Sequence, residues 1–262
     1  SFLPVMRHPD ELIDPHPVYA VFSGNVIGTA FKQDAVRNAA LGAYMGLIKQ
    51  IDDQMGALFA HLRDSGQIDN TVIVITSDHG DYLGDHWLGE KDLFHDPSVR
   101  VPMIMYDPSP EADATRGTVS DALVESIDLL PTFVDMAGGT PRYEWLEGRS
   151  LMPLIRGETP SDWRKYTISE YDFSITPMAG RLDLAPKDAR LFMVADDRWK
   201  FMHAEGGFPP MLFDLQNDPH ELNDLGRDPA YGAAVADCYD RLFEWARRLS
   251  LIHISEPTRH TR

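Results

Sequence analysis

The sequence predicts an α/β fold, and three observations lead to that class. Residues Thr71–Thr76 form a mostly apolar, β-branched run that stops at a polar turn, Ser77–Gly80, which is typical of a buried strand. Residues 34–64, just before it, repeat apolar side chains at spacings of three and four and predict a long helix. Short strand patterns between residues 166 and 214 then predict a separate antiparallel sheet.

The chain before the long helix carries little regular pattern. Four prolines interrupt residues 1–33 together with scattered polar side chains, so we expect an irregular segment that wraps the surface. His8 and His16 lie within it and are expected to be ordinary loop histidines.

The helix over residues 34–64 is expected to form part of the core. Asp34 is its expected N-cap, and Gly66 is expected to stop it. The apolar positions expected to face inward are Val36, Ala40, Leu41, Tyr44, Leu47, Ile48, Ile51, Met55, Leu58, Phe59 and Leu62.

The polar turn after the first strand holds the candidate site. Residues just past the carboxyl end of such a strand lie where α/β folds bind ligands. Asp78 offers a carboxylate and His79 an imidazole, and on one turn both can converge on a cation. A plain structural turn explains the same two residues, so both interpretations stay open. Lys91 carries a positive charge suited to an anionic substrate oxygen, whereas His86 and His95 follow no metal-binding spacing and are expected to support the site or lie on the surface.

Two further elements complete the first part of the chain. Val101–Tyr106 predicts a second strand, which Pro102 places at a strand beginning or an edge. Residues 121–136 predict an apolar helix with Asp128 as a cap. Its expected inward residues are Leu123, Ile127, Leu130, Phe133 and Val134.

The last part of the chain predicts a small sheet and a closing helix. Strands are expected at residues 166–171, 190–194, 199–202 and 211–214, with Asp196–Asp197 as the turn between the middle two. The closing helix is expected to span about residues 229–249 and to bury Cys238.

Composition excludes several classes of partner. The chain has 262 residues, 43% hydrophobic and 25% charged, which is ordinary for a globular protein. A net charge of −17 argues against nucleic acid or an anionic membrane as partner. No apolar run approaches the roughly 20 residues that cross a bilayer. The single Cys238 excludes an internal disulfide, and we expect a reducing, cytoplasmic location.

Two separated motifs carry a family resemblance. The segments Thr76–His86, Gly89–Lys91 and Val99–Ile104 resemble the carboxy-terminal signature of the sulfatase branch of the alkaline phosphatase superfamily. Residues 212–225 are similar to a second segment of that family, and within the branch the chain looks most like phosphonate monoester hydrolases. His79 favours the phosphonate and phosphodiester side, because many sulfatases have Asn there.

The resemblance implies a function and its site. It implies that Asp78 and His79 ligate one divalent metal ion, with Mn, Ca, Mg, Fe and Zn not distinguished, and that Lys91 contacts a small anionic ester substrate. It implies a metal-dependent hydrolase of phosphonate monoesters or phosphodiesters. An arylsulfatase-type sulfuric ester hydrolase and a non-catalytic metal- or anion-binding relative stay open as alternatives, as does a homo-oligomer.

The same resemblance implies that the chain is a carboxy-terminal fragment. The formylglycine nucleophile and further metal carboxylates are expected in a missing amino-terminal half, so the isolated fragment is expected to be inactive. Residues 1–155 are expected to form part of an alkaline-phosphatase-like core, a sandwich with a mostly parallel sheet flanked by helices. Residues 156–249 are expected to form an antiparallel β plus helix subdomain, and residues 250–262 a disordered or non-native tail.

Overall fold

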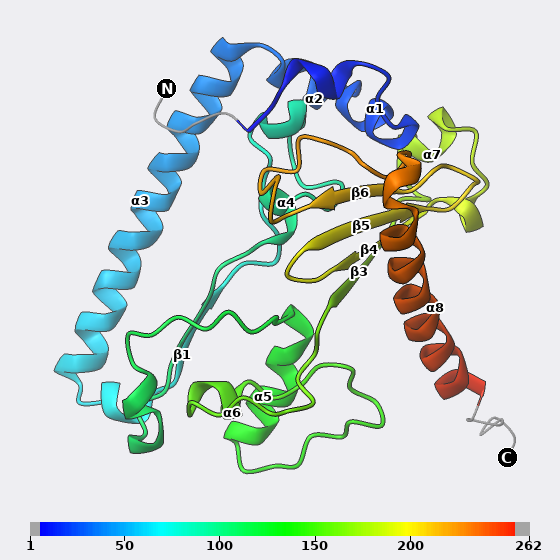
Figure 1. Ribbon diagram of the computed structural model, residues 1–262. Helices are drawn as coiled ribbons and strands as arrows, with labels where there is room; N and C mark the ends of the chain where they lie inside the picture. The colour runs from blue at the N-terminus through cyan, green and yellow to red at the C-terminus, as the bar shows by residue number, and fades with distance from the viewer. Residues whose placement is uncertain (1–5, 255–262) are drawn as a thin grey trace, which may run out of the picture. The chain divides into compact units, whose positions relative to one another are not determined.

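The computed structural model describes residues 6–254 and divides into two compact units (Figure 1). Unit 1 contains Asn25–Lys165, and unit 2 contains Met6–Gly24 together with the chain from Tyr166 onward. The division after residue 155 that the sequence suggests stays a prediction. No helix within the described range is both long and apolar enough to cross a membrane.

Unit 1 combines one long helix with short helices and a two-stranded sheet. Its longer elements are α2 (Val26–Phe31), α3 (Asp34–Asp64), β1 (Ile73–Thr76), α4 (Asp96–Val99), β2 (Met103–Tyr106), α5 (Leu129–Met136) and α6 (Met152–Ile155). Short 3-10 turns lie between them at Ile68–Asn70, Asp85–Trp87, Pro110–Thr115 and Ser126–Asp128.

The two strands of unit 1 pair antiparallel, with Ile73 opposite Tyr106 and Thr76 opposite Met103. The expected α/β class is confirmed, and the pair that the described chain contains is antiparallel although the sheet of the whole core was expected to be mostly parallel. Parallel neighbours need a crossover, usually a helix, that carries the chain back along the sheet. Residues 77–102 contain only one 3-10 turn and the four-residue α4, so the chain returns in the opposite direction.

Helix α3 forms where its periodicity predicts, but its packing differs from the prediction. Its N-cap is Gln33, one residue before the expected Asp34, and Gly66 follows it with a left-handed φ of +68°. Only Arg37, Leu41 and Leu62 are buried among its residues. The expectation that its apolar face forms part of the core is therefore wrong for the described chain.

The helix predicted over residues 121–136 begins later and buries a different face. The 3-10 turn Ser126–Asp128 leads into α5, and Ile127, Leu130 and Phe133 are exposed although they were expected to face inward. The buried residues of this segment are Asp128, Pro131 and Thr132, which lie on the side that carries hydrogen bonds.

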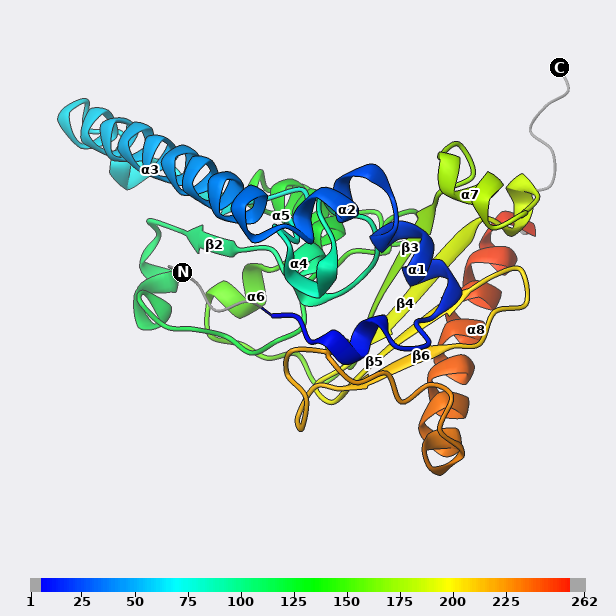
Figure 2. The same ribbon diagram turned by 90° about the horizontal axis from the view of Figure 1, so that it is seen from above.

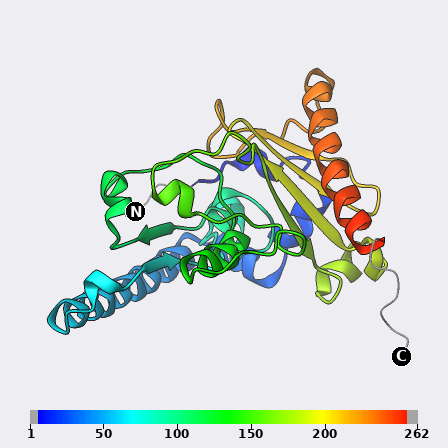
Figure 3. The same cartoon turned by 90° about the horizontal axis from the view of Figure 1, so that it is seen from below.

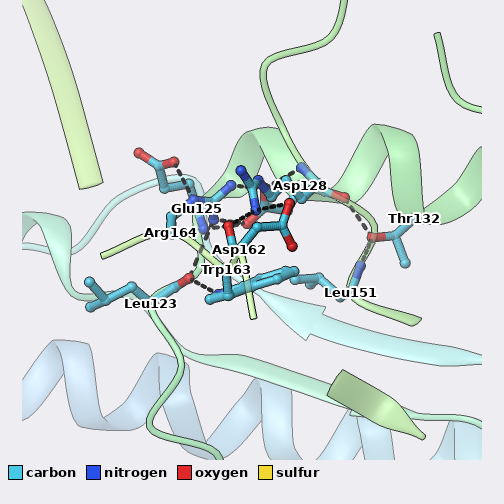
Figure 4. A network of polar contacts seen from close by, with 9 residues as sticks. Leu123, Glu125, Asp128, Thr132, Leu151, Asp162, Trp163 and Arg164 are labelled. Atoms are coloured by element: carbon cyan, nitrogen blue, oxygen red, sulfur yellow. Dashed lines mark hydrogen bonds and ion pairs between the residues drawn. The ribbon is translucent and has the colours of Figure 1, made fainter. Parts of the chain in front are cut away.

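Asp128 organises the polar network that turns this face inward (Figure 4). Its Oδ2 accepts the backbone N–H of Glu125 at 2.8 Å, so Asp128 caps the turn before α5 as the third residue of a capping box, although its side chain does not cap α5 itself. Its Oδ1 accepts the N–H of Arg149 at 2.7 Å, and the Arg164 guanidinium pairs with both carboxylate oxygens. Thr132 Oγ1 donates to the Asp128 carbonyl. Hydrophobic periodicity does not predict this buried face, because hydrogen bonds and an ion pair hold it in place rather than apolar packing.

The amino-terminal part of unit 2 is helical where an irregular segment was expected. A 3-10 turn at Pro9–Leu12 precedes α1, Pro17–Ser23, and Pro17 occupies the first turn, where a missing N–H costs nothing. His16 caps α1, and its Nε2 donates to the Pro209 carbonyl at 2.8 Å. His16 is buried, and burial lowers its pKa. It is therefore not the plain loop histidine that we expected.

The sheet of unit 2 confirms the strand predictions closely. Its four antiparallel strands lie in the order β3-β4-β5-β6, and the β4–β5 hairpin turns at Asp196–Arg198 as predicted (Figure 2). The strands are β3 (Thr167–Asp172), β4 (Arg190–Ala195), β5 (Trp199–Ala204) and β6 (Met211–Asp214). Short helical segments, α7 (Pro177–Arg181), Pro186–Asp188 and Pro229–Tyr231, lie between and after them.

Helix α8 (Gly232–Ile254) crosses one face of this sheet and closes a core (Figure 3). The core is centred on Val194, Phe201, Leu212, Cys238 and Leu242, and all five are buried. Burial of Cys238 confirms the prediction and raises the pKa of its thiol to about 12.

The carboxyl end of α8 corrects one expectation. The helix continues through Ile254, whereas it was expected to stop near residue 249. Residues 251–254 contain no helix breaker, and Pro257 is the first one that follows. The rest of the tail predicted over residues 250–262 lies outside the described residues.

Candidate metal and anion site

The loop between β1 and β2 is fixed from its first turn by close backbone packing. Gly80 N donates to the Ser98 carbonyl at 2.7 Å. A Cβ built on Gly80 would lie only 1.9 Å from the Pro97 carbonyl oxygen, so no larger residue fits there without movement. Gly80, which follows His79 directly, is thereby held against α4.

The same short helix also holds the far end of the loop. The buried Ser98 donates through Oγ to the Lys91 carbonyl at 2.5 Å. Tyr82 N donates to the Glu90 carbonyl at 2.8 Å, one residue before Lys91. Ser98 thus contacts both ends of the loop, and it brings Lys91 back to the turn that carries His79.

The ring of His79 is oriented by partners on both nitrogens. Nδ1 lies 2.7 Å from the Gly80 carbonyl oxygen, which can only accept, so Nδ1 carries the proton. Nε2 lies 3.0 Å from Lys91 Nζ, which can only donate when charged. The two contacts select the same neutral tautomer, and its Nε2 lone pair is the one that a metal ligand requires.

Asp78 completes the cluster at the end of β1. Asp78 Oδ1 accepts a hydrogen bond from the backbone N–H of His79 at 3.0 Å. This bond holds the pKa of the Asp78 carboxyl below its usual value. Its Oδ2 lies 3.5 Å from His79 Nε2, and 84% of the side chain is exposed. A carboxylate, an imidazole nitrogen and an ammonium group therefore lie close together at the start of the loop.

The donor pair fits one divalent cation. Carboxylate oxygen and imidazole nitrogen bind such ions at roughly 2.0–2.2 Å, so two donors of one ion lie at most about 4.2 Å apart. The 3.5 Å between Asp78 Oδ2 and His79 Nε2 satisfies this limit. Two donors are fewer than the four or more that such ions take. Within residues 6–254, no group of three or more acidic, His or Cys side chains could hold a metal ion.

His86 and His95 form a buried pair beside this site. Their rings stack at 4.1 Å between centroids, and Tyr82 Oη lies 2.9 Å from His95 Nδ1. Both imidazoles are almost fully buried, which excludes the surface alternative. Sequence spacing carried no signal for the stacking, since it depends on the path of the loop between the two residues.

That path uses backbone conformations that ordinary residues rarely adopt. Leu83, His86, Trp87, Glu90 and Leu93 all have φ between +48° and +92°. Each such residue costs roughly 1–3 kcal/mol, so the surrounding contacts must stabilise the loop enough to hold it in this conformation. Strain concentrated around a charged cluster is typical of functional sites.

Asp81 lies in the same loop and keeps a separate role. Its Oδ1 accepts the N–H of Leu83 at 2.9 Å, and burial raises the pKa of its carboxyl. This side chain shapes the turn after Gly80.

Family models match two overlapping parts of the chain. A model described as Sulfatase matches residues 11–139, and one described as N-sulphoglucosamine sulphohydrolase, C-terminal, matches residues 84–248. The multifunctional alkaline phosphatase superfamily protein PehA of Trinickia caryophylli is 39% identical over 206 residues, which cover 77% of this chain. The chain belongs to the sulfatase family of the alkaline phosphatase superfamily. It matches the carboxy-terminal part of that family's fold.

Solved structures of the family agree with the assignment. The phosphonate monoester hydrolase SpPMH from Silicibacter pomeroyi matches with a TM-score of 0.83 and 32% identity, over 94% of this chain and 50% of that one. The phosphonate monoester hydrolase of Agrobacterium radiobacter matches with a TM-score of 0.81 and 26% identity, over 94% and 51%. These matches confirm the alkaline-phosphatase-like fold that the sequence motifs implied.

Sulfatases are also among the family members that resemble this chain. The arylsulfatase of Clostridium perfringens is 34% identical over 73% of the chain and 37% of its own length. The match to PehA covers 39% of the length of PehA. The chain thus spans about two fifths of these curated relatives and half of the solved structures.

Proposed function

We propose that Asp78, His79 and Lys91 are the carboxy-terminal part of the site of a metal-dependent phosphonate monoester or phosphodiester hydrolase. The observation that carries the proposal is the convergence of Asp78 Oδ2, His79 Nε2 and Lys91 Nζ, each within 3.5 Å of its neighbour, on a loop anchored by Ser98. The relatives support an ester hydrolase, since they include phosphonate monoester hydrolases and an arylsulfatase.

Each residue has a chemical role that its geometry supports. Asp78 and His79 would hold the divalent metal ion, because Asp78 Oδ2 and His79 Nε2 lie 3.5 Å apart and a carboxylate oxygen and an imidazole nitrogen are both donors that such ions accept. A bound divalent ion supplies Lewis-acid polarisation of the substrate oxygen. Lys91 places a positive charge beside the same point, where it would attract the substrate anion and stabilise charge on its oxygens. The chain's net charge of −17 makes such a local positive charge necessary for an anionic ester.

The whole-protein activity requires more than these three residues. The relatives are longer, and we expect the remaining metal carboxylates and the formylglycine nucleophile in a part of the protein that this sequence does not contain. Sulfuric ester hydrolysis is the second candidate, favoured by the match to the arylsulfatase. The resemblance of His79 to the phosphonate branch and the two phosphonate hydrolase structures favour the first.

Metal content of variants tests the ligand assignment. In a full-length enzyme carrying this chain, Asp78→Ala and His79→Ala are expected to lower bound metal at least about tenfold, because a lost ligand costs 1.4 kcal/mol or more of binding. Mass spectrometry of the purified, metal-equilibrated protein measures this. His61→Ala, an exposed histidine at the end of α3, is the control and should retain full occupancy. Normal metal content in either site variant would refute the ligand roles, whatever ester the enzyme hydrolyses.

A further inference from the structure

The chain between Gly80 and Lys91 leaves the candidate site and returns to it as a narrow loop. Backbone hydrogen bonds join the two legs of this loop, and the 3-10 turn Asp85–Trp87 forms its tip. Ser98 holds the base of the loop. Most of the left-handed residues lie in the tip and in the return leg, and such a backbone persists only where other contacts hold it. The position of Lys91 therefore depends on what holds the tip.

Arg37, near the start of α3, contacts this tip directly. Its side chain is 3% exposed, and its Nη2 lies 3.5 Å from Asp85 Oδ1. The stem of the arginine packs on Gly84, where an added Cβ would lie only 2.8 Å from Arg37 Cδ. Gly84 also has a φ of +95°, so glycine suits both the backbone conformation and the close approach. The arginine and the tip of the loop fit one another in shape as well as in charge.

The stability of α3 does not explain why a charged residue is buried here. The other buried residues of the helix, Leu41 and Leu62, are apolar. Arg37 Nε is buried and has no hydrogen-bond partner within the described part of the chain. Taking a guanidinium out of water is costly, and an apolar side chain of similar length would fill the same space at lower cost. A buried cation with an unused donor is better explained by a role in fixing one particular arrangement of its neighbours.

We propose that Arg37 is a positioning residue that acts on Lys91 through the tip of the loop. Its ion pair with Asp85 and its packing on Gly84 hold the tip in its left-handed conformation. The return leg then brings the Lys91 ammonium to His79 Nε2. Arg37 does not itself contact the substrate, because its guanidinium is buried beside a carboxylate. The effect on turnover rests on the proposed function of Lys91, whereas the effect on geometry does not.

A double-mutant cycle tests whether Arg37 acts through Lys91. Arg37→Met, Lys91→Ala and the double variant are made in a full-length enzyme carrying this chain. Arg37→Met is expected to lower kcat at least about tenfold, as changes to residues that orient a site typically do, and to retain the metal, because both proposed ligands precede the loop. In the Lys91→Ala background it is expected to cause less than about twofold further loss, because the residue that it positions is absent.

Two further variants separate positioning from a general loss of folding. Asp85→Asn removes the charge of the partner with little change in size, and it is expected to reproduce the effect of Arg37→Met. Arg63→Met is the matched control, because it removes an exposed arginine from the other end of the same helix. This control is expected to leave kcat unchanged.

A second measurement checks the geometry without any reaction. In the metal-free 262-residue chain, nitrogen-15 shifts of the His79 ring report whether Nε2 accepts a hydrogen bond from Lys91. Arg37→Met and Asp85→Asn are expected to move the Nε2 shift to the value found in Lys91→Ala. Arg63→Met is expected to leave it where it is.

Unchanged ring shifts in folded Arg37→Met would overturn the proposal, whatever its effect on turnover, and Asp85→Asn decides by the same criterion if Arg37→Met does not fold. An equal loss of kcat with and without Lys91 would also overturn it, since a general effect on folding acts in both backgrounds. If instead Lys91→Ala leaves kcat unchanged, the proposed function of Lys91 fails, and the ring shifts alone decide whether Arg37 positions the loop.

Discussion

The two units bury their apolar residues very differently. In unit 2, alternate residues of three strands and the inner side of α8 meet in a core whose central members are at most 5% exposed. In unit 1, most large apolar side chains of α3 and α5 face outward, with Ile51 at 59% and Leu130 at 56% exposed. Both regions show clear hydrophobic periodicity in sequence. In unit 2 the apolar face of α8 packs against the sheet, whereas in unit 1 much of the apolar face of α3 is exposed.

The difference teaches what a periodic stripe can and cannot predict. A stripe predicts that a helix forms and which face seeks a contact. It does not say that the contact lies in the same stretch of chain. Polar contacts also hold parts of unit 1 together, among them the Asp128 network and the hydrogen bond between Gly80 and Ser98 of α4. Substitutions in the two units should therefore have contrasting effects.

The largest contrast is expected between two apolar truncations. Phe201→Ala in unit 2 removes a fully buried ring and is expected to cost about 3–5 kcal/mol in the free energy of unfolding. Ile51→Ala in α3 removes an exposed side chain and is expected to cost less than about 0.5 kcal/mol in the same chain. Urea unfolding followed by circular dichroism measures both. Comparable losses would show that α3 is covered within this chain, and the comparison between the units would fail.

The sequence predicted the fold correctly where an element packs against elements that are its neighbours along the chain. Strands β3 to β6 and the Asp196–Asp197 turn follow from alternation and turn chemistry, because their partners are neighbours along the chain. The antiparallel direction of β1–β2 pairing was not predicted, because it depends on what the intervening loop contains. The face of α5 was wrong, because Asp128 and Thr132 are buried by hydrogen bonds.

The candidate site was predictable to a similar extent. Asp78 and His79 are adjacent in sequence, so their convergence needs only one turn. The family motif assigned Lys91, but its 3.0 Å contact with His79 depends on Ser98 tying the loop closed. The stacking of His86 on His95 requires left-handed residues that no propensity favours, and therefore sequence reasoning missed it.

A second contrast lies within the polar contacts of unit 1. Asp128→Ala would leave the Arg164 guanidinium buried without its main partner and is expected to cost about 3 kcal/mol of stability. Glu125, 3.2 Å from Arg164 Nε, keeps the loss near the lower end of the range for broken buried pairs. Asp162→Ala is the matched control, because this carboxylate pairs with Arg149 at 81% exposure and should change stability by less than about 1 kcal/mol. Equal losses of stability for the two variants in thermal unfolding would show that the Asp128 network does not stabilise α5.

The smallest contrast compares two glycines of unit 1 and separates the closely packed loop from the open helix. Gly80→Ala would drive a methyl group into the Pro97 carbonyl, so we expect a loss of about 1–3 kcal/mol and displacement of His79 from Lys91. Gly56→Ala meets nothing within 4 Å on α3 and is expected to stabilise the chain by about 0.5–1 kcal/mol, because alanine favours the helix. Chemical unfolding gives both free energies, and imidazole nitrogen shifts report the His79 tautomer. A neutral Gly80→Ala with the tautomer intact would show that α4 does not hold the turn. A destabilising Gly56→Ala would mean that α3 is covered at that position, which would contradict the exposure of Ile51 and Leu58 on the same helix.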